Sequence, residues 1–265
     1  MSEGDILYER RDRIGWITIN RPERRNALTR HNMSIDLPDA WLRFEADEEA
    51  RVAIISGAGE FAFCAGMDVK ERAGAFQHSA DGGASEQTRE TRVSPRANGV
   101  TKPVIGAVNG VCTGVGMQIV ADCDLLIASE SAYFSDARTS VGLVPAMGAA
   151  ELARAMPPHE ALRLIFLGRH GRMTAQRAYQ IGFVGELVPP GELREAAEEL
   201  ARTVMRNAPH AVRLAKQAVW ESLDRGLAEG MANARAIAAA NPTIEDVREG
   251  ARSFVERRDP DWKLR

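Results

Sequence analysis

The sequence predicts an α/β protein in which a strand-rich first half is followed by a helical last third. In the first half, short runs of β-branched and other apolar residues alternate with segments of helical spacing. From about residue 145 onward the apolar residues recur at helical spacing. Two glycine-bearing turns, at 61–71 and 109–116, each follow a predicted strand. The 265 residues are enough for one large domain or two small ones.

Strands are predicted where β-branched residues cluster between turn signals. ILYER (6–10) and GWITINR (15–21) form a hairpin pair of predicted strands. VAIIS (52–56) is predicted to be a buried strand by its β-branched run. Further strands are predicted at VIGAV (104–108), DLLIAS (124–129) and AYFS (132–135).

Helical spacing appears first between the early strands. A helix is predicted over 29–47, and Pro38 is expected to bend it or to break it near its start. The polar segment 72–100 contains Gly-Gly, and we expect a mobile loop around 78–86 and a helix near 86–97. In the last part of the chain, helices are predicted at 146–156, 159–168, 174–182, 192–208, 210–226, 227–240 and 245–258.

Bulk composition narrows the class of protein. The formal net charge is −3 and no basic region stands out, which argues against a nucleic-acid-binding protein. No apolar run approaches the roughly 18 residues needed to span a bilayer, and the N-terminal MSEGDILYERRDR lacks an apolar signal core. We therefore expect a cytoplasmic protein. Cys64, Cys112 and Cys123 show neither a CxxC pair nor a zinc-ligand spacing, so we expect buried free thiols and no metal.

The two glycine turns suggest a site for negative charge. Each offers backbone N–H groups after a strand, and two such turns can aim at one oxygen. A thioester carbonyl that becomes an enolate carries its charge on that oxygen, which fixed backbone donors stabilise. Since only the backbone matters, Met67 and Val115 can serve as the donors.

Other uses of these glycines fit the sequence less well. A phosphate loop would need a Lys-Ser/Thr pair after the second turn, and none follows. A dinucleotide fingerprint would need a third glycine, which GVGMQI lacks. The plainest alternative is that Gly110, Gly114 and Gly116 only permit a tight strand-to-helix crossing.

Several motifs occur in an order that resembles a known family. They are NRPERRNALT (20–29), FAFCAGMDVKE (61–71), KPVIGAVNGVCTGVGMQIVADCDLLIAS (102–129), SVGLVP (140–145) and EGARSFVERRDPDW (249–262). On these motifs the chain resembles the crotonase superfamily, also called the enoyl-CoA hydratase/isomerase family. The resemblance implies a crotonase spiral of ββα units over 1–195, followed by a helical trimerisation region over 196–265. It also implies a homotrimer, or a hexamer formed by two trimers.

The same resemblance implies an acyl-CoA thioester as ligand, with coenzyme A as part of the substrate and no separate cofactor. Carried over by position, the backbone donors are Met67 and Val115. Arg24 and Arg25 are expected near the phosphates or adenine, and Phe254 and Arg257 are expected to close that site from a neighbouring subunit. The remaining substrate-binding positions implied are Ala27, Ala65, Gly66, Asp68, Val69, Lys70 and Gly114, with a capping role for the carboxylate of Asp68.

The chain departs from the family at its acid/base positions. Where hydratases of the family carry two glutamates, this sequence has Gln118 and Arg138. Neither side chain accepts a proton at neutral pH, which argues against two-carboxylate hydration. The positions at which isomerases of the family carry one acid hold Arg138 and Ala146.

Other carboxylates near these motifs have plainer expected roles. Asp136 lies two residues before Arg138, and we expect a salt bridge that shapes the pocket rather than a catalytic pair. Glu151 lies on the helix after SVGLVP, where a solvated helix face is expected. Glu86 and Glu90 lie in the segment where some relatives place an acid/base residue, but solvated charges are the expectation there as well.

Two functions therefore stay open on the sequence alone. The first is an acyl-CoA enzyme of the enoyl-CoA hydratase/isomerase type, a lyase or isomerase with an atypical acid/base set, for which hydration, hydrolysis, decarboxylation and isomerisation are all considered. The second is an acyl-CoA-binding protein with little or no turnover.

Overall fold

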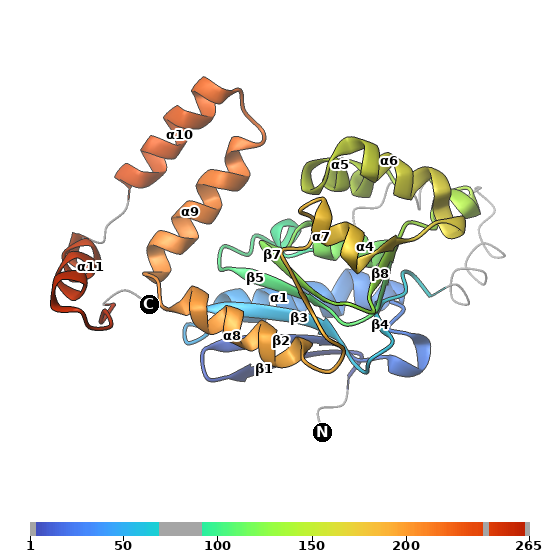
Figure 1. Cartoon of the computed structure of the whole chain (residues 1–265), viewed down its shortest axis with the longest axis horizontal. Helices are drawn as coiled ribbons and strands as arrows, with labels where there is room; N and C mark the ends of the chain where they lie inside the picture. Colours follow the sequence, from blue (N-terminus) through green and yellow to red (C-terminus); the bar gives the residue numbers. More distant parts are fainter. Residues whose placement is uncertain (1–3, 69–91, 241–243, 263–265) are drawn as a thin grey trace.

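The computed structural model describes residues 4–68, 92–240 and 244–262 and contains two sheets with helices around them (Figure 1). The larger sheet has the strand order β1-β2-β3-β5-β7-β10. Strand β1 is antiparallel to β2, and the other neighbours are parallel. Its strands are β1 (Ile6–Arg11), β2 (Ile14–Ile19), β3 (Val52–Gly57), β5 (Val104–Val108), β7 (Leu125–Ser129) and β10 (Glu186–Val188).

The smaller sheet has the order β4-β6-β8-β9. Its strands are β4 (Ala62–Cys64), β6 (Val111–Thr113), β8 (Tyr133–Ser135) and β9 (Met173–Thr174), and only the β8–β9 pair among them is antiparallel. Successive strand pairs, β3–β4, β5–β6 and β7–β8, each place one strand in each sheet. The pair β5–β6 leads into α4 (Val115–Ala121), which completes a ββα unit of the predicted kind.

Strand β3 is apolar along most of its length, with no alternation of apolar and polar residues, because both of its faces are buried. Ile54 lies in a buried cluster with Ala197 and Ala201 of α8 (Leu193–Met205). The next residue, Ile55, lies in the cluster that holds Trp41 of α1 (Leu37–Ala46). Because successive strand residues face opposite sides of a sheet, both faces of β3 are buried.

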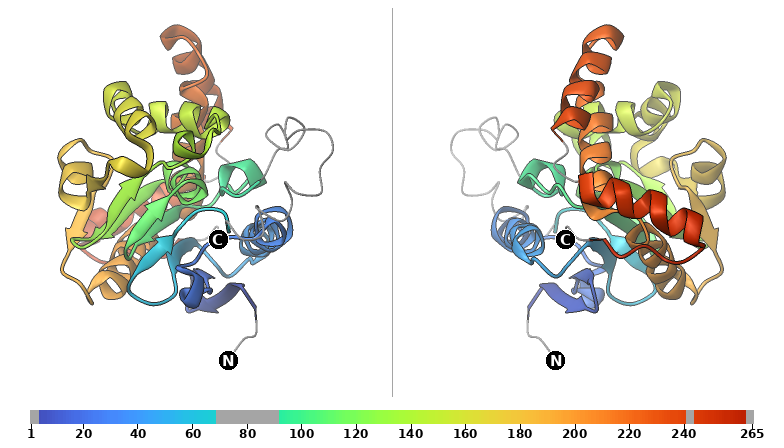
Figure 2. Two further views of the ribbon diagram at one scale, coloured as in Figure 1. Left: turned by 90° about the vertical axis from the view of Figure 1, so that its right-hand side faces the viewer. Right: turned by 90° about the vertical axis from the view of Figure 1, so that its left-hand side faces the viewer.

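The remaining helices lie over the smaller sheet or extend away from the core. In Figure 1, helices α5 and α6 lie above α4, and α9 and α10 form an antiparallel pair to the left of the sheets, with α11 farther out. In the right-hand view of Figure 2, α11 lies in front of the rest of the chain. The predicted division at residue 195 falls within α8 and stays a prediction. The bounds are α5 (Ala146–Ala155), α6 (Pro158–Leu167), α7 (Ala175–Gln180), α9 (Pro209–Ser222), α10 (Leu227–Ala239) and α11 (Ile244–Glu256), with short turns η1 (Pro22–Arg24), η2 (Asn32–Asp36), η3 (Arg96–Asn98), η4 (Thr139–Val141) and η5 (Gly168–His170).

The helix predicted over 29–47 is confirmed, and the one predicted near 86–97 needs correction. The first consists of a π-helical turn, η2, that runs into α1, and Pro38 occupies the first turn of α1. The described end of the helix predicted near 86–97 is irregular until η3, because Pro95 disfavours a helical conformation for the residue before it. The loop expected around 78–86 lies outside the described residues. Strands β4, β6, β9 and β10 were not predicted, because two or three residues are too few to show alternation.

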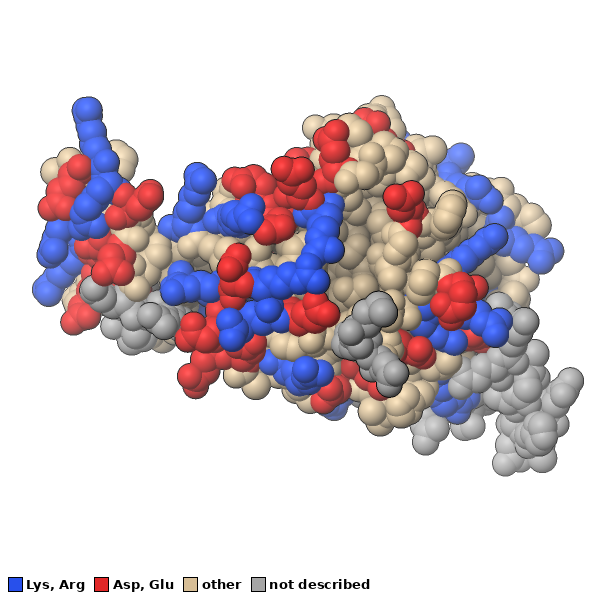
Figure 3. Space-filling model, turned by 90° about the horizontal axis from the view of Figure 1, so that it is seen from below, with Lys and Arg blue, Asp and Glu red and all other residues tan. Residues whose placement is uncertain are grey.

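The surface of the described chain is charged but mixed in sign. On the face shown in Figure 3, Lys and Arg side chains lie interspersed with Asp and Glu. On α8, for example, Arg202 pairs with both Glu198 and Glu199. None of the helices described is both long and apolar enough to cross a membrane.

Candidate functional site

The two predicted glycine turns meet at the ends of two parallel strands. Strands β4 and β6 pair in parallel, with Cys64 opposite Cys112, so their carboxyl ends lie at the same edge. Gly66 follows β4 with φ of +93°, and Gly114 follows β6 with φ of +57°, both in the region that favours glycine. A Cβ atom added to Gly114 would lie 3.5 Å from the Cα of Gly66. The two turns therefore lie side by side, with room for little more than a methyl group between the two glycines.

The backbone of Met67 is oriented by a short parallel bridge to Leu28. The N–H of Leu28 donates to the carbonyl of Gly66, and the N–H of Asp68 donates to the carbonyl of Leu28, each at 2.8 Å. In a parallel pair of this kind, the residue between the two bonded groups directs its own N–H to the opposite side. The N–H of Met67 therefore faces away from the segment that contains Leu28.

The N–H of Val115 opens helix α4. Gly114 is the N-cap and Val115 the first helical residue, so this N–H has no acceptor within the helix. Gly116 lets the helix begin close to β4, because an added Cβ would lie 2.9 Å from the Cβ of Cys64 and 3.0 Å from its carbonyl oxygen. The close packing holds the start of α4 beside the first turn.

The thiol of Cys64 lies directly behind these turns but is not suited to act as a nucleophile. Burial raises its pKa to about 12, so it stays protonated near neutral pH. Cys64, Cys112 and Cys123 are all free and buried, as predicted.

The loop that carries the predicted phosphate-binding residues runs alongside the first turn. The N–H of Ala65 donates to the carbonyl of Arg25 at 3.1 Å. Arg24 and Arg25 are exposed, and Ala27 is bonded through its carbonyl to the guanidinium of Arg21. That guanidinium also lies 3.5 Å from the carboxylate of Asp68. The predicted residues on these two segments are thus brought together, while the turn that Asp68 is expected to cap lies outside the described residues.

Asn26, which the sequence did not single out, fixes this loop. It is fully buried with a φ of +57°, and its amide nitrogen donates to the carbonyls of Ala58 and Ala62 at 2.9 and 2.7 Å. Its amide oxygen accepts from the N–H of Arg21 at 2.9 Å. A signal was available, since asparagine is the non-glycine residue most at ease in the left-handed region.

Asp136 and Arg138 form the predicted salt bridge. The guanidinium binds both carboxylate oxygens, Nε to Oδ1 at 2.8 Å and Nη2 to Oδ2 at 2.6 Å, and Asp136 is fully buried. Gly148 of α5 makes room for this pair, because an added Cβ would lie 2.5 Å from each terminal nitrogen of Arg138. The guanidinium of Arg138 is therefore fixed against α5.

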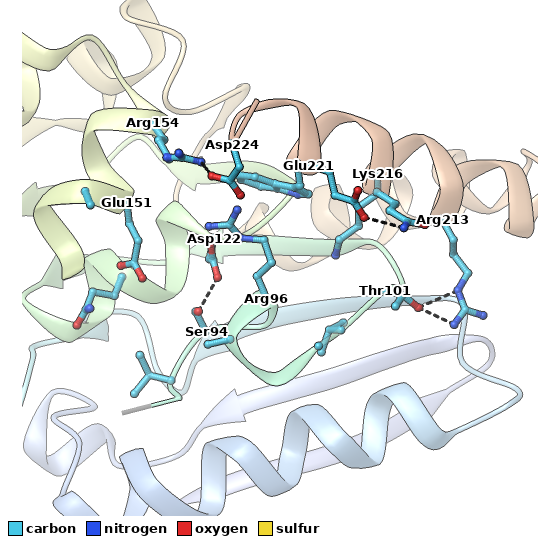
Figure 4. A pocket seen from close by; sticks show the side chains of 18 of the residues that line it. Ser94, Arg96, Thr101, Asp122, Glu151, Arg154, Arg213, Lys216, Glu221 and Asp224 are labelled. Atoms are coloured by element: carbon cyan, nitrogen blue, oxygen red, sulfur yellow. Dashed lines mark hydrogen bonds and ion pairs between the residues drawn. The ribbon is translucent and has the colours of Figure 1, made fainter. Parts of the chain in front are cut away.

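A cavity of about 1020 Å³ lies between α4, α5, segment 93–101 and α9 (Figure 4). Gln118, which is buried, lines the end nearest the turns and lies one helical turn after Val115. Met67 and Val115 are not among the described residues that line the cavity, and Gln118 is the lining residue on the first turns of α4.

The wall opposite α5 is fixed by Asp122 at the end of α4. Its carboxylate accepts from Ser94 Oγ at 2.5 Å and from Arg96 Nε at 2.7 Å. The guanidinium of Arg96 in turn stacks over the ring of Trp220 on α9, at 4.2 Å from the ring centroid. Segment 93–98 and α9 are held to α4 in this way.

Glu151 contradicts the expectation of a solvated helix face. Figure 4 shows its side chain extending from α5 into the cavity, and one carboxylate oxygen, Oε2, is buried without a hydrogen-bond partner among the described residues. Burial, followed by the charge of Asp122, raises the pKa of Glu151. Hydrogen bonding from Gln118 and the charges of Arg138 and Arg96 lower that pKa by less. The reason is tertiary: α5 packs against α4, so this face of α5 is turned inward.

Some predicted site residues are not brought to the turns. Phe254 and Arg257 lie at the end of α11, which Figure 1 places at the opposite end of the molecule, and Phe254 is 86% exposed. Val69 and Lys70, together with Glu86 and Glu90, lie outside the described residues.

The paired-strand spiral and the two converging glycine turns define a member of the crotonase superfamily. The family model for enoyl-CoA hydratase/isomerase matches residues 9–265. Carnitinyl-CoA dehydratase of Salmonella arizonae is 36% identical over 252 residues, which cover 93% of this chain and 94% of that protein. (E)-benzylidenesuccinyl-CoA hydratase of Thauera aromatica is 31% identical over 259 residues, covering 97% and 98%.

Solved structures agree with this assignment. The crystal structure of an enoyl-CoA hydratase/isomerase from Mycobacterium paratuberculosis has a TM-score of 0.87 and 37% sequence identity, with 100% of both chains covered. The chain belongs to the enoyl-CoA hydratase/isomerase family, and the predicted crotonase fold is confirmed.

Proposed function

We propose that this chain is an enzyme that acts on acyl-CoA thioesters and stabilises an enolate oxygen on the N–H groups of Met67 and Val115. The observation that carries the proposal is the close approach of the turns of Gly66 and Gly114. A thioester oxygen placed between these turns would accept two hydrogen bonds from groups that are already fixed. Donors that need no reorganisation stabilise the enolate more than the ground-state carbonyl, which lowers the barrier to its formation.

The coenzyme A part of the substrate would lie along the loop beside the first turn. The exposed guanidinium groups of Arg24 and Arg25 provide positive charge for its phosphates. The thioester and pantetheine would follow the backbone from Ala65 to Lys70, with Ala27 and Gly114 beside them. The acyl group would then extend past Gln118 into the cavity.

A homotrimer, or a hexamer of two trimers, belongs to the same proposal. Apolar side chains on the projecting helices are exposed in the single chain, among them Leu227 at 82%, Val247 at 63% and Phe254 at 86%. Assembly through these helices would cover apolar surface. It would also bring Phe254 and Arg257 to the coenzyme A site of a neighbouring subunit.

The reaction class follows from what the side chains can do. Two relatives are named as a dehydratase and a hydratase of CoA compounds. In this chain Gln118 and Arg138 cannot exchange protons at neutral pH. We therefore favour proton transfer at the carbon next to the thioester over two-carboxylate hydration.

A second candidate function is acyl-CoA binding with little or no turnover. The presence of Gln118 and the Asp136–Arg138 salt bridge favours it, because both family acid/base positions are occupied by groups that cannot act as bases.

One set of measurements separates these functions. Butyryl-CoA binding is measured by calorimetry, the thioester carbonyl stretch of the bound ligand by infrared difference spectroscopy, and turnover by hydration of crotonyl-CoA and by deuterium uptake at Cα in D₂O. We expect binding, a lowered stretching frequency and deuterium uptake. Binding with a lowered frequency but no chemistry supports the binding protein. Absence of binding, or an unchanged carbonyl frequency, contradicts the proposed oxyanion site.

A further inference from the structure

Glu151 borders the space in which the acyl chain would lie. Gly148 and Glu151 are three residues apart on α5 and so share one face of that helix, which packs against Arg138 through Gly148. On the other side, the Gln118 side chain lies near enough to the Glu151 carboxylate to lower its pKa. Glu151 therefore reaches, from a different helix, the region between the two positions where hydratases of the family carry glutamates.

Glu151 differs from the nearby carboxylates because one of its oxygens has no hydrogen-bond partner among the described residues. Asp136 is held through both oxygens by Arg138, and Asp122 is held by Ser94 and Arg96. Glu151, by contrast, keeps Oε2 buried without a partner among the described residues. Buried carboxylate oxygens are nearly always hydrogen-bonded, and a catalytic role is one of the recognised reasons for an exception.

From this placement we propose that Glu151 is the acid/base residue that transfers a proton to and from the acyl chain; the inference rests on the proposed function. The geometry places its carboxylate in the wall of the cavity into which the acyl group would extend, with Oε2 buried and without a partner among the described residues. A carboxylate that is harder to ionise than a surface glutamate is also a better base. Gln118 then acts as a positioning residue, because it holds the carboxylate through its amide.

The proposed step balances without water, oxidant or cofactor. With a 3-enoyl-CoA, the ionised Glu151 removes one proton from Cα. The C–H electron pair becomes part of a dienolate whose negative charge rests on the thioester oxygen, next to the N–H groups of Met67 and Val115. Glu151, now protonated, returns the proton to Cγ, and the double bond moves into conjugation with the carbonyl. The carboxylate is regenerated in its ionised form.

The test compares Glu151→Gln and Glu151→Asp with the full-length wild type and with Glu195→Gln, which removes an exposed carboxylate on α8. The substrate is 3-butenoyl-CoA in D₂O. Deuterium uptake is followed by NMR and formation of crotonyl-CoA by ultraviolet absorbance, while calorimetry with butyryl-CoA reports binding. We expect Glu151→Gln to lower both rates by about 10²-fold or more and to retain butyryl-CoA binding. Glu151→Asp should recover part of the rate, and Glu195→Gln should match the wild type.

Thermal unfolding of the same variants separates a catalytic role from a structural one. If Glu151 only supported the fold, its replacement by Gln would lower the Tm along with the rate. If Glu151 is instead a catalytic carboxylate whose buried oxygen lacks a hydrogen-bond partner among the described residues, Glu151→Gln should lose the rate and raise the Tm at pH 7. A wild type that binds butyryl-CoA but forms no crotonyl-CoA from 3-butenoyl-CoA overturns the assignment of Glu151, as does a Glu151→Gln variant within threefold of the wild-type rate. A wild type that does not bind butyryl-CoA refutes the proposed function itself.

Discussion

Replacing Val115 by proline removes one proposed oxyanion donor while disturbing the fold little. Val115 is the first residue of α4, where proline is favoured, and its N–H has no acceptor within the helix. The preceding residue is glycine, with φ of +57° and ψ of −114°, which is more permissive before proline than any other residue. Proline and valine have the same number of side-chain carbons, so Val115→Pro leaves no large cavity.

The expected loss of rate in Val115→Pro follows from the number of N–H donors to the enolate oxygen. Losing one of two fixed N–H groups should slow enolate formation by about 10²- to 10³-fold, which corresponds to roughly 2.7–4 kcal/mol of transition-state stabilisation. The matched control is Val115→Ala, which keeps the N–H but deletes two carbons from a side chain that is 8% exposed. That deletion should destabilise the fold by about 2 kcal/mol and leave the rate nearly unchanged.

The two variants should therefore rank in opposite orders for stability and rate. Deuterium uptake by 3-butenoyl-CoA gives the rate, urea unfolding gives the stability, and the carbonyl frequency of bound butyryl-CoA reports the lost hydrogen bond directly. If Val115→Pro exchanges protons as fast as Val115→Ala, the N–H of Val115 does not contact the thioester oxygen and the oxyanion model fails.

Three further outcomes follow from single contacts. Because burial raises the folded-state pKa of Glu151, the folded chain binds that proton more tightly than the unfolded chain. The Tm advantage of Glu151→Gln should be full above the raised pKa and disappear as the pH falls below the ordinary value of 4.5; an advantage independent of pH would contradict this origin. Gly148→Ala should displace Arg138 from buried Asp136 and cost about 3 kcal/mol in urea unfolding, and a neutral result would show that the guanidinium has another place to lie. Asn26→Ala should cost about 3 kcal/mol through lost hydrogen bonds and its left-handed backbone, and equal stability of Asn26→Gly and Asn26→Ala would exclude the backbone contribution.

The correct predictions rest on local motifs. The turns at Gly66 and Gly114 were predictable from the sequence because only glycine readily adopts the positive φ that each turn requires. The apolar run of β3 likewise predicts burial on both faces. The Asp136–Arg138 salt bridge was predicted because opposite charges two residues apart can meet without help from the rest of the fold.

Features that depend on distant packing were not predictable in this way. The two glycine turns were expected to aim at one oxygen, but the pairing of β4 and β6 that brings Gly66 beside Gly114 was not predicted, because strands of three residues show no alternation. Glu151 resembles any charged residue on an amphipathic helix. It is turned into a cavity because α5 packs on α4, and because Arg96 joins α9 to the far wall by stacking on Trp220. Those relations join residues far apart in sequence, and no local periodicity encodes them.

The proposed oxyanion donors are main-chain atoms, which has a consequence for how such a protein diversifies. A mutation at position 67 or 115 exchanges the side chain but, unless it introduces proline, leaves the amide where it was. The residues nearest the reacting carbonyl can therefore vary in size and shape while the charge-stabilising groups are inherited unchanged. Selectivity for the acyl group and stabilisation of its enolate can therefore change independently of each other during evolution.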